Sequence, residues 1–151
     1  MGFSTYHLSS TWQFGVSPGP VLAALADVAG YPRWWPQVRE VRRTASDAGE
    51  LVVRSVLPYR LVFAVRATRQ DEAAGVLEAR MTGDLVGWSR WTVTARPGGA
   101  RVLFEEEARL GKPLLRLLSA PARPVFLTNH AAMMRGGERG LRGHLAAASG
   151  P

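Results

Sequence analysis

Cysteine is absent from the 151-residue chain, and lysine occurs once, at Lys112. Without cysteine the chain cannot form a disulfide, a thiolate metal site or a cysteine nucleophile, and this agrees with a reducing, cytoplasmic location. The three histidines, His7, His130 and His144, lie far apart and lack the paired spacing of metal ligands. A glycine-rich phosphate loop is also missing. We therefore expect no metal and no other cofactor.

Long apolar runs are absent as well. No run reaches the roughly 18 residues that a membrane span needs, and the first ten residues are polar, so we expect neither a membrane span nor a secretory signal. The apolar share of 46% is ordinary for a globular protein. The length predicts a single domain, residues 1–151, with a sizeable core.

Basic residues outnumber acidic ones, 19 to 12, for a formal charge of +7. The arginines are spread along the chain, and their densest group is Arg33, Arg39, Arg42 and Arg43. No aromatic stacking motif accompanies this charge, so we expect no nucleic-acid partner. The excess of arginine, alanine and glycine indicates a compositional bias.

Alternating apolar and polar residues predict strands through most of the chain. Short turns rich in glycine, proline or aspartate separate them, which is typical of an antiparallel meander with one covered face. The expected strands are residues 6–16, 38–43, 51–57, 60–68, 77–85, 88–96 and 101–110, with a tight turn at Gly87 before the sixth.

Two short helices are expected after the first strand. Ser17 is a favourable N-cap and Pro18 suits the first helical position, so a helix should run to about Val28 and end at Gly30. Prolines then bracket the pair of tryptophans at 34 and 35, which limits that segment to a single turn of helix.

A long amphipathic helix is expected at residues 124–148, preceded by a short helical piece near 114–118. Its second half contains four glycines, each of which costs about 1 kcal/mol in a helix interior. We interpret them as places where the helix lies close to another backbone, while its first half stands away from the sheet and leaves a cavity. A frayed or broken helix is the alternative. The glycines are Gly136, Gly137, Gly140 and Gly143.

The order of these elements resembles the START-like (SRPBCC) superfamily, which includes polyketide cyclases/dehydrases, birch-type pollen allergens and lipid-transfer domains. Two stretches carry the likeness, Y-P-R-W-W-P-Q-V at 31–38 and N-H-x-x-M-M-R-x-G-E-R-G-L-R at 129–142. The resemblance implies an α+β helix-grip fold. A curved antiparallel sheet of about seven strands would wrap around the C-terminal helix, with a hydrophobic cavity between them.

Two residues are candidates for acid–base chemistry in such a cavity. His130 shares a helix face with Phe126 and Met133, and an imidazole titrates near neutral pH. It has an alternative role as a structural hydrogen-bonding group. Glu106 is in phase with the apolar residues of its strand, and if it points inward it needs a partner, for which Arg69 is a candidate. A β-bulge that turns Glu106 outward is the alternative.

We therefore predict that the protein binds a small hydrophobic or aromatic molecule, polyketide- or lipid-like, as a monomer or homodimer. One alternative is a polyketide cyclase/dehydrase that uses His130, and another is an interaction module whose own side chains fill the cavity. The expected ligand-binding residues are Trp34, Trp35, Tyr59, Phe63, Met81, Trp91, Phe104, Phe126, Asn129 and Met133.

Overall fold

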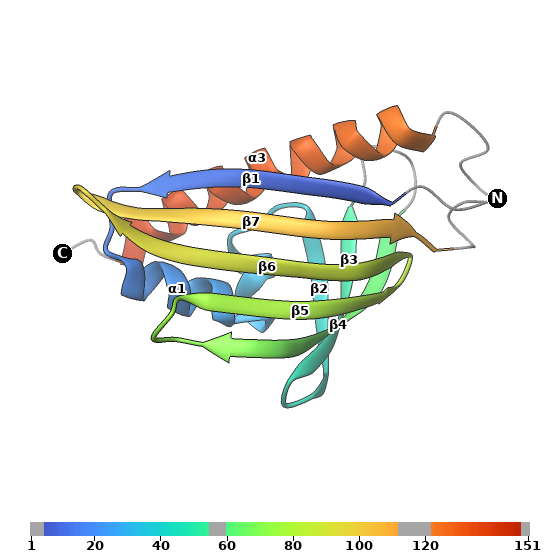
Figure 1. Cartoon of the computed structure of the whole chain (residues 1–151), viewed down its shortest axis with the longest axis horizontal. Coiled ribbons are helices and arrows are strands. Elements are labelled where there is room, and N and C mark those ends of the chain that lie inside the picture. The colour runs from blue at the N-terminus through green and yellow to red at the C-terminus, as the bar shows by residue number, and fades with distance from the viewer. Residues whose placement is uncertain (1–4, 55–59, 112–121, 149–151) are drawn as a thin grey trace.

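The structure is a computed structural model, and it describes residues 5–54, 60–111 and 122–148. Within these ranges a first strand is followed by two short helices, six strands and one long helix (Figure 1). The elements are β1 (Tyr6–Phe14), α1 (Pro18–Ala26), η1 (Val28–Arg33), β2 (Val38–Ala45), β3 (Ala48–Arg54), β4 (Arg60–Asp71), β5 (Val76–Gly83), β6 (Leu85–Arg96), β7 (Gly99–Leu110) and α3 (Ala122–Ala148).

The seven strands form one antiparallel sheet in the order β1-β7-β6-β5-β4-β3-β2. Strands β2 to β7 form the expected meander, and β1 returns to pair with β7, with Tyr6 opposite Ala108. In β7 every second residue from Ala100 to Leu110 is buried, while the residues between them are half-buried or exposed. This alternation confirms a sheet that is covered on one face.

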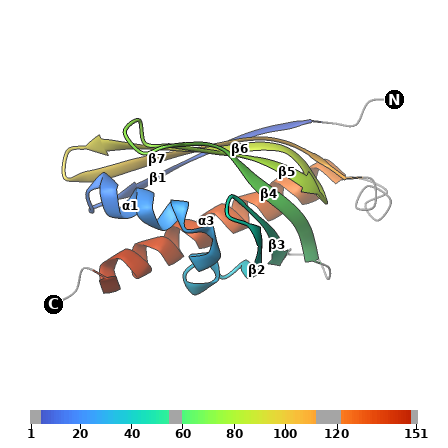
Figure 2. The same ribbon diagram turned by 90° about the horizontal axis from the view of Figure 1, so that it is seen from below.

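Helix α3 crosses the covered face of the sheet. Figure 2 shows it beneath the arched strands, with α1 and η1 packed beside it under one end of the sheet. Its buried residues Phe126, Met134, Leu141 and Leu145 belong to the same core as the inward side chains of the strands. The predicted architecture, a curved seven-stranded sheet around a long C-terminal helix, is confirmed.

The glycines of α3 lie where the helix meets the segment that follows η1. A Cβ atom added at Gly137 would lie 2.6 Å from the Trp35 indole, and one at Gly140 would overlap the Trp34 carbonyl oxygen. The Trp35 indole Nε1 also donates a hydrogen bond of 2.9 Å to the Met133 carbonyl oxygen. The helix is therefore continuous and closely packed at these glycines, although Gly143 has no neighbour within 4 Å.

The predicted C-terminal end of the first helix is wrong. Helix α1 ends at Ala26 rather than Val28, and the chain continues as the 3-10 helix η1, which contains Gly30. Gly30 is buried inside η1, where a Cβ would lie 2.5 Å from the Asp27 carboxylate, so Gly30 does not terminate α1. Ser17 occupies the N-cap position, but its side chain makes no capping hydrogen bond.

The predicted turn before the sixth strand is also misplaced. The chain reverses at Gly83 and Asp84, where Gly83 has a φ of 110° and the Asp84 carboxylate accepts a hydrogen bond from the Val62 N–H. Gly87 instead lies within β6 opposite Ala108, where a Cβ would overlap the Glu107 carbonyl oxygen. The expected helical piece near 114–118 and the end of the predicted strand 51–57 lie outside the described residues.

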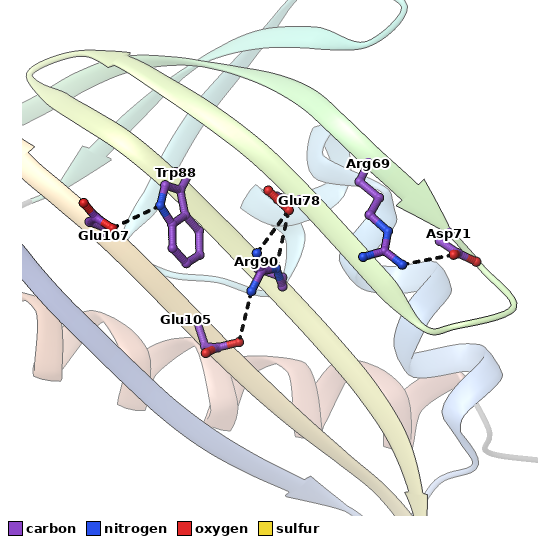
Figure 3. A network of polar contacts seen from close by, with 7 residues as sticks. All are labelled: Arg69, Asp71, Glu78, Trp88, Arg90, Glu105 and Glu107. Atoms are coloured by element: carbon purple, nitrogen blue, oxygen red, sulfur yellow. Dashed lines mark hydrogen bonds and ion pairs between the residues drawn. The ribbon is translucent and has the colours of Figure 1, made fainter.

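Polar side chains cover the face of the sheet turned away from α3. Figure 3 shows Arg90 between Glu78 and Glu105, and the Trp88 indole donating to Glu107. The Arg90 guanidinium also lies 4.8 Å from the Trp88 ring centre. These part-buried pairs lie on the solvated face of the sheet, where an ion pair contributes about 1 kcal/mol or less.

Candidate functional site

A cavity of about 210 Å³ lies between the sheet and α3. Its walls come from α1, η1, strands β2 to β7 and the first half of α3, from Phe126 to Met134. The close packing of the glycines starts immediately after this half, at Gly136. The first half of α3 therefore borders the space, and the glycine-rich second half closes against the rest of the core.

Most of the residues expected to bind a ligand do line this cavity. They are Trp35, Phe63, Met81, Trp91, Phe104, Phe126, Asn129 and Met133. Trp34 is not among the lining residues: its ring stacks on Trp35 at 5.3 Å and packs on the Tyr31 ring at 5.1 Å, so it supports the wall from behind. Tyr59 lies outside the described residues.

Aromatic rings form a continuous wall along the cavity. Trp35, Trp91 and Phe104 are in ring contact, with centroid separations of 6.2 Å and 4.5 Å. At one end of the wall, Phe104 and Phe126 stack on the imidazole of His130 at 6.1 Å and 6.4 Å. The four rings come from β6, β7, α3 and the segment after η1, so each element contributes a surface that suits a flat apolar molecule.

Glu106 points into the cavity. It is 7% exposed, and neither the β1–β7 pairing nor the β6–β7 pairing contains a bulge at its position. Of the two alternatives, an inward Glu106 or a β-bulge that turns it outward, the structure therefore has the inward one. Its partner is His130, whose Nε2 atom lies 3.0 Å from the Glu106 Oε1 atom, with both side chains largely buried.

The contact between Glu106 and His130 has the distance of an ion pair but not the alignment of a good hydrogen bond. The His130 Nε2 atom is buried and has no hydrogen-bond partner among the described residues. A buried carboxylate next to a buried imidazole is costly unless both groups are satisfied. The pair therefore retains unused hydrogen-bonding capacity at the cavity wall.

Arg69 is not the partner of Glu106, contrary to the prediction. The register between β4 and β5 shifts between Ala67 and Arg69, so that Arg69 pairs with Glu78. Such a bulge reverses the alternation of the strand from that point. The Arg69 side chain lies on the outer face of the sheet, as Figure 3 shows, and its Nη2 atom is 3.2 Å from Asp71.

Further polar groups line the cavity. Ser89 lies directly opposite Glu106 in the β6–β7 register, and Asn129 is buried beside His130 on α3. Sequence analysis did not single out Ser89, although it is in phase with Trp91 and Val93 and could have been found from that alternation. Among the described residues, no group of three or more histidine or acidic side chains is arranged to hold a metal.

Tyr31 also lines the cavity. Its hydroxyl donates a hydrogen bond of 2.6 Å to the Leu25 carbonyl oxygen. Burial raises the pKa of this phenol well above its usual range, and the Trp91 indole partly opposes that rise. The hydroxyl therefore stays protonated and joins α1 to the 3-10 helix at the cavity wall.

The cavity reaches the surface near the tip of the β2–β3 hairpin. The lining residues there are exposed, and they come from β2, the hairpin turn and the bulged part of β4. Asp47 in this turn forms an ion pair with Arg66 of β4, with 3.0 Å between Asp47 Oδ1 and Arg66 Nη1, and this pair connects the hairpin to β4. Exposed lining residues at this opening are Arg43, Ser46, Asp47 and Gln70.

These features define a helix-grip protein with a mainly apolar cavity under its long helix. The chain belongs to the family described as polyketide cyclase/dehydrase and lipid transport, whose model matches residues 5–147. No curated protein matches the sequence. The match spans the first strand to the end of α3 and confirms the START-like resemblance. No helix in the described ranges is both long and apolar enough to cross a bilayer.

Solved structures share this fold at low sequence identity. A START superfamily protein from Mycobacterium smegmatis is 14% identical with a TM-score of 0.74, over 95% of this chain and 99% of its own. The ZhuI aromatase/cyclase from Streptomyces sp. R1128 is 16% identical with a TM-score of 0.73, over 98% and 100%. Ara h 8.0201 is 11% identical with a TM-score of 0.72, over 95% and 99%. At these identities the likeness extends to the fold alone.

Proposed function

We propose that the protein binds one small, mainly apolar molecule with an aromatic ring in the cavity under α3. The observation that carries this proposal is a space of about 210 Å³ walled by aromatic side chains, with the Glu106–His130 pair in its lining. Concave apolar sites with a few convergent polar groups are the usual form of small-molecule sites. The family description, which includes lipid transport, agrees with a carrier of this kind.

The volume limits the size of the ligand. An engineered apolar cavity of about 150 Å³ holds benzene, whereas sites for drug-sized molecules are typically about 300–1,000 Å³. At about 210 Å³ this cavity suits one or two fused rings rather than a long folded chain. The lining methionines Met81, Met133 and Met134 are flexible and allow limited adjustment. A space of this size also favours binding over the alternative of an interaction module with a filled interior.

Binding of naphthalene to protein labelled with ¹³C at the methionine methyl groups tests the proposal. We expect saturable shifts of the Met81 and Met133 signals, because both side chains line the cavity. An Ala67→Leu variant should weaken binding, since Ala67 lines the cavity. Ala64→Leu is the matched control, because Ala64 is an exposed residue of the same strand. The absence of saturable shifts, or equal effects of the two variants, would refute the proposal.

A second candidate function is dehydration of a hydroxyketone, as in a polyketide cyclase/dehydrase. The observation that favours it is the short distance, 3.0 Å, between a carboxylate and an imidazole inside an apolar cavity. In that reaction a base removes the proton next to the carbonyl, and an acid protonates the departing hydroxyl, so the products are an enone and water. His130 would serve as base or acid, with Glu106 as its partner.

The probe for this candidate is 4-hydroxy-4-phenylbutan-2-one, a hydroxyketone with a single ring. Its conjugated product absorbs in the near ultraviolet, so turnover is followed directly. We expect His130→Ala to abolish turnover while naphthalene binding persists. Turnover that is undiminished in this variant, or absent from the unmodified protein at every pH tested, would remove the enzymatic candidate and leave the binding proposal standing.

A further inference from the structure

Polar lining groups gather on three neighbouring elements of the cavity wall. Ser89 on β6 lies opposite Glu106 on β7, and directly opposed residues in such a ladder have Cβ atoms about 5 Å apart. His130 on α3 faces them, with its Nε2 atom 3.0 Å from Glu106. We call Ser89, Glu106 and His130 the polar end of the cavity.

Glu106 retains hydrogen-bonding capacity beyond its contact with His130. An ionised carboxylate accepts hydrogen bonds at about four lone-pair positions and donates none. Within residues 5–54, 60–111 and 122–148, the Glu106 carboxylate makes its polar side-chain contact with His130. A buried acceptor in this state is stabilised by any donor that reaches it from the cavity.

The neighbours of Glu106 are held in place by packing. The imidazole of His130 lies between Phe104 and Phe126, nearly parallel to both rings, with interplanar angles of 26° and 21°. The Phe126 ring is stacked in turn on Tyr6 at 4.3 Å. Because these rings hold the imidazole, His130 stays beside the Oε1 atom of Glu106, whose side chain is part of the cavity lining.

We infer that Glu106 makes the site selective for a ring that carries a hydroxyl group over the same ring with a carboxylate. This inference rests on the proposed binding function. A phenolic hydroxyl donates a hydrogen bond to the carboxylate, whereas a carboxylate ligand has no proton to donate and places a second negative charge beside the first. The apolar rings of the wall then accept the remainder of the molecule.

Three probes with one skeleton test this selectivity by isothermal titration calorimetry on the full chain. They are naphthalene, 2-naphthol and 2-naphthoate at a pH where the naphthol is protonated and the naphthoate is ionised. A hydrogen bond to a charged group strengthens binding by about tenfold or more. We therefore expect 2-naphthol to bind at least about tenfold more tightly than naphthalene, and 2-naphthoate to bind more weakly than both.

Glu106→Gln is the decisive variant, because it removes the charge and keeps the shape of the side chain. It should lower the preference for 2-naphthol over 2-naphthoate at least about tenfold, since the amide can also donate to a carboxylate. Glu105→Gln is the matched control. Glu105 is the preceding residue of β7, faces outward and pairs with Arg90, so its replacement should leave the preference unchanged.

The possible outcomes separate this inference from the proposed function. Binding of naphthalene with no preference for 2-naphthol in the unmodified protein would overturn the inference and leave the proposed function intact. If Glu106→Gln and Glu105→Gln both keep the preference for 2-naphthol over 2-naphthoate, the inference is likewise overturned and the proposed function remains. Absence of binding by all three probes would overturn both. The comparison of probes on the unmodified protein needs no variant, so it stands even if Glu106→Gln fails to fold.

Discussion

The second half of α3 provides a sharp test of close helix packing. Replacing glycine by alanine inside a helix normally stabilises it by about 1 kcal/mol. At Gly140, however, the added Cβ would overlap the Trp34 carbonyl oxygen and approach the Pro36 ring at 3.5 Å. The first of these neighbours is backbone, so relief requires the helix and the segment after η1 to move apart.

The expected magnitudes follow from these two opposing effects. Overpacking costs about 1–3 kcal/mol, and the gain in helix propensity returns about 1 kcal/mol, so Gly140→Ala should lower the free energy of unfolding by up to about 2 kcal/mol. Gly143 has no neighbour within 4 Å. Gly143→Ala should therefore raise the free energy of unfolding by about 0.5–1 kcal/mol.

Urea unfolding followed by tryptophan fluorescence measures both changes in the same assay. For a domain of this size 1 kcal/mol corresponds to about 2–4 °C in Tm, so thermal unfolding gives an independent check. Equal m-values would show that the two variants unfold from comparable states. If Gly140→Ala stabilised the protein as much as Gly143→Ala, the helix would not be closely packed there, and the explanation of its glycines would fail.

Two further predictions concern pH. Burial raises the pKa of Tyr31 above its unfolded value of about 10, so the protonated phenol contributes stability that is fully present below pH 10 and is lost as the pH rises further. In urea unfolding, the free energy of unfolding should therefore fall more steeply above pH 10 in the unmodified protein than in Tyr31→Phe. Parallel curves for the two proteins would contradict this. The pKa of Asp71 is lowered, first by the hydrogen bond that the Ala74 N–H donates to its carboxylate and then by Arg69. The ionised Asp71 therefore contributes to the stability of the fold above its unfolded pKa of 3.8, and this contribution is lost as the pH falls through the lower folded pKa. An NMR titration of the Asp71 carboxyl should give a midpoint below 3.8, and Asp71→Asn should lose less stability on acidification than the unmodified protein.

The strand pattern was readable from the residues because a strand covered on one face must alternate. In β7 that alternation extends from Ala100 to Leu110 without interruption, and it placed Glu106 among the inward residues. The glycines at 137 and 140 were equally informative, since several glycines in one helix require a packing reason. The order of elements and the general position of the cavity followed from these local features.

Other features depended on contacts between segments far apart in the sequence. The bulge after Ala67 turns Arg69 outward, and its position depends on how β4 pairs with β5 rather than on the residues of β4. Glu106 and His130 are 24 positions apart, and their pairing depends on where α3 crosses β7. Trp34 and Trp35 are adjacent and chemically identical, yet of the two Trp35 lines the cavity and donates its indole hydrogen bond to the helix backbone. Alternation and propensity act over a few residues, whereas partner choice among buried groups is set by which elements pack together.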